Sequence, residues 1–287
     1  MIKSQNLDIY MLINIFNNFI MNTRHHLDFL NAKNLNLLSY ATVAAFVLAF
    51  ISFFYISFSW MMLGLTILMY YLIFGFGVSA TLHRAITHRS IVFHPWVEIF
   101  GKFIAMMGGT GSVISWVMTH RAHHKYSDTD KDPHPPWKIS KTLMGQYPRV
   151  ETRGMRRYAD SAFNRFTHRY YFLVISLYAL AWSLLGIEFF FYGFLYPALL
   201  TIVASNVVNK YAHSKLIFNY RRHDTKDTSQ NSPVVGLLTW GEGWHNSHHR
   251  YPGRARFAMS VWEIDLSFYL VILLEKLGLA KIKPHNP

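Results

Sequence analysis

The stretch that decides the fold is NLNLLSYATVAAFVLAFISFFYISFSWMMLGLTILMYYLIFGFGVSATL, residues 34–82. Its 49 residues include no Asp, Glu, Lys, Arg or His. As one helix they would extend for about 74 Å at 1.5 Å per residue, more than twice the ~30 Å hydrocarbon core of a bilayer. The run therefore predicts two transmembrane helices. Their turn is expected near residues 57–61, where Ser57, Ser59 and Trp60 interrupt the apolar sequence.

A second apolar run, residues 170–209, contains only one charged residue, Glu188. It predicts a second hairpin that turns around residues 186–192. Buried helices of a large soluble protein are the alternative for both runs, but such helices are usually shorter and polar on one face. The apolar stretch 91–118 is interrupted by GGTGS at Gly108–Ser112. We expect an interfacial helix there, because a fifth crossing would place the flanking histidines on opposite sides of the membrane.

The basic residues are concentrated on one side of the two hairpins. Residues 84–169 carry 14 Lys and Arg against 6 Asp and Glu, and residues 210–287 carry 11 against 6. By the positive-inside rule these segments and both termini are predicted to be cytoplasmic. Contact with anionic lipid is sufficient to explain the charge, which would also suit an acidic electron-donor protein. No nucleic-acid-binding motif is present, and no nucleic-acid partner is expected.

The sequence predicts two parts. Residues 1–33 are expected to form an interfacial segment, because the apolar run within them is too short to span a bilayer. Residues 34–287 are expected to form a single domain, since no internal repeat or low-complexity linker is present. The fold class is an all-α membrane protein with four transmembrane helices in two hairpins and a cytosolic histidine-rich helical cap. The hairpins are 34–82 and 170–209, and the cap consists of 83–169 and 210–287.

Histidines occur in compact groups within the cap. Of 16 histidines, eight lie in HRAITH, HRAHH and HNSHH. On a helix, positions i, i+3 and i+4 share a face, so each H-x-x-H-H projects three imidazoles into one volume. Eight imidazoles are too many for one ion, and two metal ions with open coordination positions fit the number. Because imidazole suits iron, zinc, copper and nickel alike, the ligand type leaves the metal open.

The position of these groups, at the ends of hydrophobic helices, indicates oxidation of a lipid chain. An unactivated methylene has no leaving group and no acidic proton, so metal-activated dioxygen is needed to attack it. A lipid hydroxylase or alkane monooxygenase would use similar histidine groups and is an alternative. A divalent-metal transporter is a more remote alternative. It would need polar ligands near mid-membrane, whereas residues 34–82 contain no ionisable group.

The motifs HRAITHRS, HRAHHKYSDTDKDPH, NKYAH and GEGWHNSHHRYP resemble the histidine boxes of the integral-membrane fatty acid desaturases, in particular the delta-9, stearoyl-CoA-desaturase-like branch. The resemblance implies an O2-dependent enzyme that introduces a cis double bond, expected at delta-9, into a saturated acyl chain on CoA, a lipid or a carrier protein. It implies a cytosolic centre of two iron ions, with O2 as co-substrate. It also implies a separate electron donor such as a ferredoxin, and location in a bacterial inner membrane.

Matched motif by motif, the resemblance implies nine metal-ligating histidines. They are His83, His88, His120, His123, His124, His213, His245, His248 and His249. Asn209, four residues before His213, matches an asparagine that holds a metal-bound water. Trp116 matches a tryptophan near the acyl entrance.

Carboxylates near the histidine boxes are candidates for residues that support the metal ligands, and the residues just before the second box bear on the substrate. Carboxylates often orient the imidazoles that bind metals. The candidates for this role are Asp128, Asp130, Asp132 and Glu242, although the three aspartates equally suit a solvated turn. Acyl-CoA users in the family often carry charged residues just before the second box, where this chain has Ser115, Met118 and Thr119. That difference weakens the case for CoA.

Overall fold

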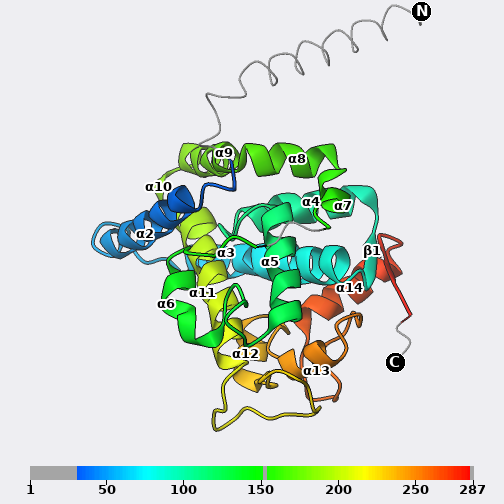
Figure 1. Ribbon diagram of the computed structural model, residues 1–287. Helices are drawn as coiled ribbons and strands as arrows, with labels where there is room; N and C mark the ends of the chain where they lie inside the picture. Colours follow the sequence, from blue (N-terminus) through cyan, green and yellow to red (C-terminus); the bar gives the residue numbers. More distant parts are fainter. Residues whose placement is uncertain (1–30, 151–153, 285–287) are drawn as a thin grey trace, which may run out of the picture.

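The computed structural model describes residues 31–150 and 154–284, so the segment predicted for residues 1–33 falls almost entirely outside it (Figure 1). The described chain is mostly helical. Its elements, in order, are α2 (Leu35–Ser52), α3 (Trp60–Tyr70), η2 (Tyr71–Thr87), β1 (Ile91–Phe93), α4 (Pro95–Met106), α5 (Val113–Tyr126), η3 (Pro136–Lys138), α6 (Ile139–Leu143), α7 (Arg156–Ala159), α8 (Ala162–Arg169), α9 (Tyr171–Leu184), α10 (Ile187–Phe189), η4 (Phe190–Leu195), α11 (Tyr196–Tyr211), α12 (Pro233–Leu238), α13 (His245–Arg250), α14 (Leu266–Lys276) and β2 (Ala280–Ile282).

Within the described residues, three helices are long and apolar enough to cross a membrane. They are Leu35–Ser52, the continuous helix Trp60–Thr87 formed by α3 and η2, and Ile187–Tyr211 formed by α10, η4 and α11. The helix α9 is apolar but has only 14 residues. At 1.5 Å per residue it extends for about 21 Å, less than the hydrocarbon core. The second predicted hairpin therefore pairs one long helix with one short helix.

Local sequence explains where these helices begin and turn. The side chains of Asn34 and Ser59 accept hydrogen bonds from the backbone N–H groups of Leu37 and Met62, which caps α2 and α3. The second hairpin turns more tightly than the sequence indicates. Gly186 has φ +130°, a conformation that favours glycine, and the helix resumes at Ile187.

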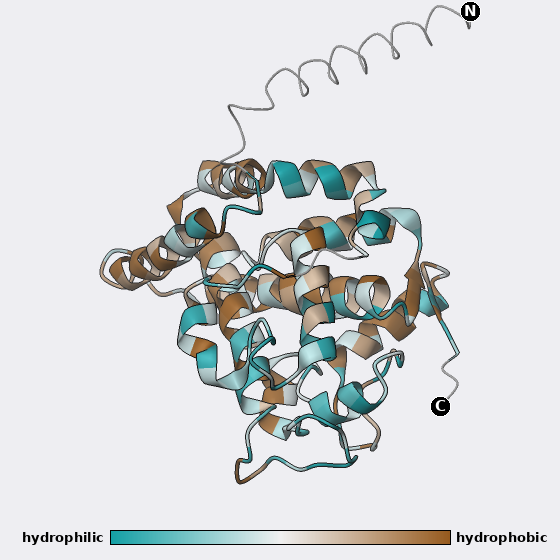
Figure 2. Ribbon diagram, in the orientation of Figure 1, coloured by the Kyte–Doolittle hydropathy of each residue, from teal (hydrophilic) through white to brown (hydrophobic). Residues whose placement is uncertain are grey.

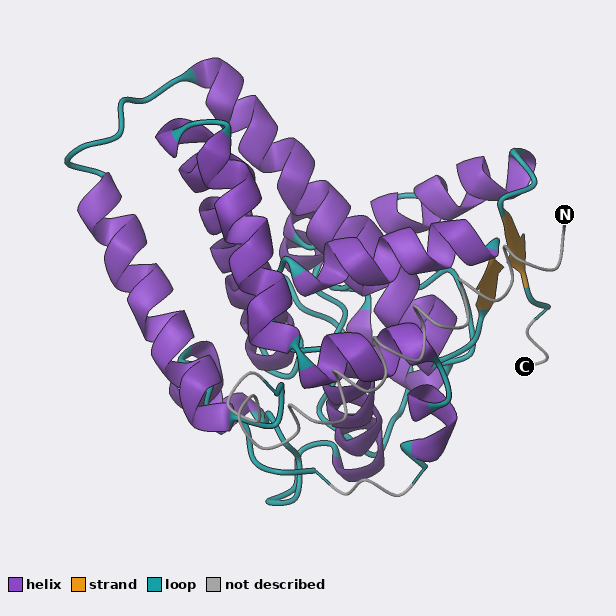
Figure 3. Cartoon of the chain, turned by 90° about the horizontal axis from the view of Figure 1, so that it is seen from above, coloured by secondary structure: helices purple, strands orange, loops and turns teal. Residues whose placement is uncertain are grey.

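The two hairpin turns lie at the same end of the molecule (Figure 3). Tyr192 donates a hydrogen bond through its hydroxyl to the carbonyl of Ser57, at 3.1 Å, which joins the second hairpin to the loop of the first. The hydroxyls of Ser52 and Tyr196 are 2.7 Å apart. Figure 2 shows hydrophobic residues along α2 and α9, and hydrophilic residues around α13 at the other side. The apolar helices and the hydrophilic residues around α13 therefore lie on different sides of the described chain.

The stretch 91–118 differs from the single broken helix that the sequence predicts. It forms β1, α4 and α5, with Gly109 and Gly111 at positive φ in the turn between the helices. The strand β1 pairs antiparallel with β2, with Val92 opposite Lys281. The described residues are mostly helical, in agreement with the predicted all-α class, but this short ribbon was not predicted, because the second strand lies near the far end of the sequence and has no local signal. The helix α4 exposes Trp96, Ile99, Phe100 and Phe103 at helical spacing, as an interfacial helix would.

Close packing of α4 on η2 gives a testable prediction at Gly77. A Cβ atom at this position would lie 2.7 Å from the backbone nitrogen of Ala105, so the helices would have to separate. We expect Gly77→Ala to reduce the free energy of unfolding by about 1–3 kcal/mol. Thermal unfolding in detergent measures this. Gly64→Ala is the matched control, because nothing lies within 4 Å of the Cβ position there; equal melting temperatures for the two variants would contradict the prediction.

Candidate metal centre

The nine histidines singled out in the sequence come together on the polar side of the hairpins. His83 lies near the end of η2 and His88 directly follows it. The other seven are contributed by α5, by the turn that follows α11 and by α13: they are His120, His123, His124, His213, His245, His248 and His249. Segments far apart in the chain therefore supply one site.

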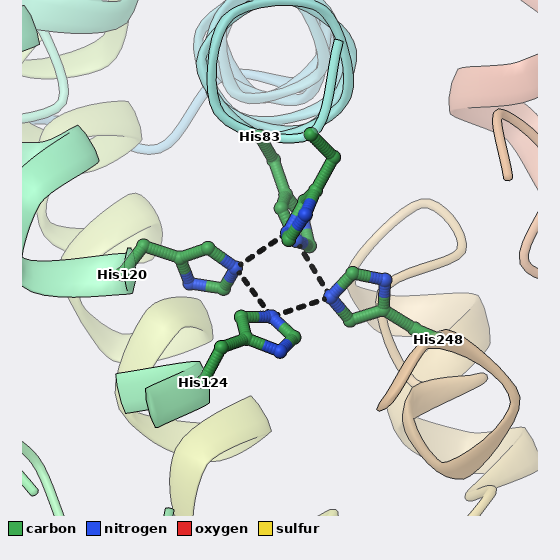
Figure 4. Close-up of side chains that lie close together, drawn as sticks. His83, His120, His124 and His248 are labelled. Carbon is green, nitrogen blue, oxygen red and sulfur yellow. Dashed lines mark hydrogen bonds between the residues drawn. The ribbon is translucent and has the colours of Figure 1, made fainter. Parts of the chain in front are cut away.

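Five of these histidines form a first group: His83, His88, His120, His124 and His248. One ring nitrogen from each lies within 4.8 Å of all the others. The Nε2 atom of His248 is 2.9 Å from that of His83 and 2.9 Å from that of His124 (Figure 4). The Nε2 atom of His120 is 3.0 Å from that of His124 and 3.1 Å from that of His88. The rings point inward, toward a common centre.

The remaining four histidines form a second group: His123, His213, His245 and His249. The Nε2 atoms of His213 and His245 are 3.0 Å apart, and those of His123 and His249 are 3.3 Å apart. The groups adjoin, because the rings of His124 and His249 stack with centroids 4.6 Å apart. The structure therefore divides the nine histidines into five and four.

This arrangement fits metal ions better than hydrogen bonding among the rings. The Nε2 atom of His124 faces those of His120 and His248, and a single proton cannot point at both. Two nitrogens bound at right angles to one ion, with bonds of about 2.1 Å, would lie about 3.0 Å apart. Burial first, and the neighbouring imidazoles second, hold the pKa of His120 and of His248 well below the ordinary value. Neutral rings with free lone pairs are the form that binds metals.

Four carboxylates hold the outer nitrogens of these rings. The Nδ1 atom of His83 is 2.6 Å from Glu242, that of His123 is 3.0 Å from Asp132, that of His213 is 3.2 Å from Asp128, and that of His249 is 2.7 Å from Asp227. A carboxylate that accepts the Nδ1 proton leaves Nε2 free to bind a metal. Asp130, also a candidate from the sequence, is exposed and has no hydrogen bond to a histidine among the described residues.

Glu242 is the most deeply anchored of these carboxylates. Burial alone would raise its pKa, but His83, Arg84 and Ser79 together lower the pKa to about 2. Arg84 is fully buried and lies 3.4 Å from Glu242 and 2.9 Å from Asp265. Glu242 is therefore ionised and fixed where it orients His83.

Sequence reasoning missed Asp227. The available signal was DTKD, residues 224–227, an acidic stretch between two histidine boxes that resembles DTDKD after the second box. Burial alone would raise the pKa of Asp227, but His249 and Ser229 lower it. Asp227 also accepts a hydrogen bond from the Ser229 backbone, at 3.1 Å, which fixes its side chain.

We expect Asp227→Asn to lower metal affinity by about 10–100-fold, as is typical when a partner of a ligand imidazole is lost. Metal bound per protein, measured during titration with a chelator, tests this. Asp224→Asn is the matched control, because Asp224 is fully exposed three residues earlier in the chain. If the two variants retain metal equally, Asp227 does not orient His249.

A cavity of about 440 Å³ leads to the histidines. It is lined by His83, His120 and His245, and by apolar side chains that include Phe74, Val78 and Ile114. Trp116 also lines it and stacks on His120, with the rings 5.1 Å apart and inclined by 17°. Asn209 lies in the same lining. The cavity is therefore suited to an apolar chain that passes beside the histidines.

The fold and the two histidine groups define a helical membrane protein with a candidate dinuclear metal centre. Residues 58–260 match the family model described as fatty acid desaturase. The chain belongs to the fatty acid desaturase family and is an oxidoreductase that desaturates fatty acyl chains.

Curated relatives cover most of the chain. An sn-1 stearoyl-lipid 9-desaturase of Anabaena variabilis is 35% identical over 78% of this chain and 84% of its own length. An sn-2 palmitoyl-lipid 9-desaturase of Nostoc sp. (strain 36) is 34% identical over 80% of this chain and 84% of its own. An acyl-CoA 5-desaturase of Anemone leveillei is 34% identical over 78% of this chain and 72% of its own. The relatives thus include enzymes named for lipid-linked and for CoA-linked chains.

Proposed function

We propose that this enzyme introduces a cis double bond at carbon 9 of a saturated acyl chain carried by a membrane lipid or by CoA. The convergence of nine histidines beside a cavity lined by apolar residues carries this proposal. The printed activities of two relatives, which act on stearoyl-lipid and palmitoyl-lipid at position 9, support the position.

We propose iron as the metal and dioxygen as the co-substrate. Two iron ions held by the five- and four-histidine groups would supply the dioxygen activation that an unactivated methylene pair requires. In the overall reaction the chain loses two hydrogen atoms, that is, two protons and two electrons, as the double bond forms. The electron donor adds two electrons, two protons come from water, and O2 is reduced to two molecules of water.

The residues of the chain position these reactants. Glu242, Asp132, Asp128 and Asp227 orient imidazoles, and we retain Asn209 as the residue that hydrogen-bonds a water ligand. Trp116 stacks on one face of His120 and forms part of the cavity lining there. Exclusion of water by the apolar lining would protect the reactive centre from side reactions.

We also propose a fourth transmembrane helix in addition to the three long apolar helices. We propose that α9 is the fourth crossing, because it is apolar throughout its 14 residues and directly follows the basic residues at the end of α8. The predicted topology then applies: both hairpin turns lie on one side, and the cap, both termini and the metal centre lie in the cytoplasm, beneath a bacterial inner membrane. Residues 34–287 act as one domain, with residues 1–33 at the interface. The basic cap would attract an acidic electron donor such as a ferredoxin.

Fatty acid analysis in a desaturase-deficient bacterial host tests this function. Expression should produce chains two mass units lighter, with the double bond located at carbon 9 by fragmentation. Chains sixteen units heavier would instead identify a hydroxylase. If the folded, metal-loaded protein supplied with reductant yields neither, the proposal is wrong.

A further inference from the structure

Two buried polar atoms in the cavity lining have no role in the centre described above. His168 Nε2 and Thr110 Oγ1 are buried and have no hydrogen-bond partner among the described residues. Both residues line the cavity. A buried polar group without a partner is costly, so its presence calls for water or a ligand to pair with it.

His168 is fixed in place by its other atoms. Its Nδ1 is 2.6 Å from the hydroxyl of Ser112, and its carbonyl accepts a 2.9 Å hydrogen bond from the N–H of Ala32. The hydroxyls of Ser112 and Ser115 are 3.1 Å apart, which extends the polar network along α5. Burial first, and Lys33 second, lower the pKa of His168 to about 4, so the ring is neutral at pH 7. The site therefore offers a rigid, uncharged hydrogen-bonding group.

The lining of the cavity also contains two cations. Lys33 and Arg149 are exposed cations in the lining, and Lys33 follows the residue that hydrogen-bonds His168. The neutral polar residues, the apolar side chains and the reactive histidines make up the rest. A glycerophospholipid carries groups that suit each of these kinds of side chain, namely a phosphate, an ester, an acyl chain and the methylenes to be oxidised. In an acyl-CoA a long pantetheine arm separates the thioester from the phosphates, so a cation beside the ester site suits it less.

The length of α5 between the polar site and the histidines is compatible with such a substrate. Ser112, which holds His168, lies eight residues before His120, or about 12 Å along the helix. A fully extended polypeptide rises about 1.2 Å per backbone bond, at three bonds per residue, and an extended acyl chain is similar. About ten bonds of an extended acyl chain therefore cover this length of α5. That length is compatible with an ester bound at His168 while carbons near position 9 lie beside His120.

We propose that His168 and Thr110 bind the ester group of an acyl chain that is still part of a membrane glycerophospholipid, and that Lys33 and Arg149 pair with its phosphate. This inference rests on the proposed function and names the substrate class of the same site. His168 is a substrate-positioning residue that sets which carbons reach the metals.

The test uses full-length protein in detergent-solubilised membranes of the host, which supply the reductant. Phosphatidylglycerol with a deuterated stearoyl chain and deuterated stearoyl-CoA are given separately, and the labelled chain is analysed in the form supplied. We expect His168→Leu to raise KM for the phospholipid about tenfold, with a smaller change in kcat, and to yield several double-bond positions. His168→Gln, which keeps a hydrogen-bonding group, should restore a single position. His94→Leu, at an exposed histidine, is the control.

Each result decides the inference. Bound metal per protein identifies a variant that has merely misfolded, and His168→Gln then carries the test. The inference is overturned if His168→Leu leaves KM and the double-bond position unchanged, if His168→Gln is no better than His168→Leu, or if the unmodified enzyme acts on stearoyl-CoA and not on the phospholipid. Those outcomes leave the desaturase function intact. If the unmodified enzyme forms no alkene from either substrate, the proposed function fails as well.

Discussion

Replacing His120 by alanine is expected to abolish alkene formation, with activity at least about 10³-fold below that of the unmodified enzyme. His120 is buried, and its Nε2 faces those of His88 and His124 at 3.1 Å and 3.0 Å. Loss of a ligand opens the first histidine group and also removes the ring on which Trp116 stacks. Loss of a residue that only hydrogen-bonds a ligating histidine typically lowers metal affinity or activity about 10–100-fold. Loss of a ligand itself should therefore lower activity further. Double-bond analysis of host lipids and elemental analysis of the purified protein measure the two effects.

His94→Ala is the matched control for this variant. His94 precedes α4, is exposed, and belongs to neither histidine group among the described residues. It should retain two metal ions and full activity. An active His120→Ala enzyme with undiminished metal content would show that His120 is not a ligand.

Glu242→Gln is expected to have the largest effect of any change outside the nine histidines. The amide is almost the same size as the carboxylate, but it removes the charge that holds His83 and faces buried Arg84. We expect a loss of about 10–100-fold in metal affinity. Leaving a buried charge with one partner fewer should also reduce the free energy of unfolding by about 3 kcal/mol. Chelator titration and thermal unfolding of the metal-free protein separate the two contributions.

Asp130→Asn provides the comparison for Glu242→Gln. It also converts an acid to its amide close to a histidine box, but Asp130 is exposed and contacts no imidazole among the described residues. Metal content and melting temperature should be unchanged. A loss in Asp130→Asn that matches the loss in Glu242→Gln would indicate a general effect of charge instead of orientation of His83.

Much of the helical layer was predictable because its signals are local. The long apolar runs predicted the helices Leu35–Ser52 and Trp60–Thr87 to within about five residues, whereas Ile187–Tyr211 begins inside the predicted turn, residues 186–192. The ribbon of β1 and β2 was not predictable, since its strands are three residues each and nearly two hundred positions apart. The exact position of the turn at Gly186 was not predictable. Glycine can adopt the positive φ found there, but a glycine in the sequence does not require it.

The part of the site that depends on the spacing of histidines along the sequence was predictable. The H-x-x-H-H motifs indicate which rings share a helix face, but the division into five and four depends on how α5 and α13 face each other. For the same reason the sequence could not show which carboxylates contact the histidines. Asp130 and Asp132 are alike in sequence, yet only Asp132 turns inward to His123, and Asp227 reaches His249 from a loop. Tertiary contacts of this kind have no periodic signal.

Anomalous diffraction from crystals of the purified, metal-loaded enzyme, recorded above and below the iron absorption edge, tests the central claim most directly. The account predicts two iron peaks, one among His83, His88, His120, His124 and His248, and one among His123, His213, His245 and His249. A single peak, peaks outside these groups, or peaks that belong to another metal would contradict it.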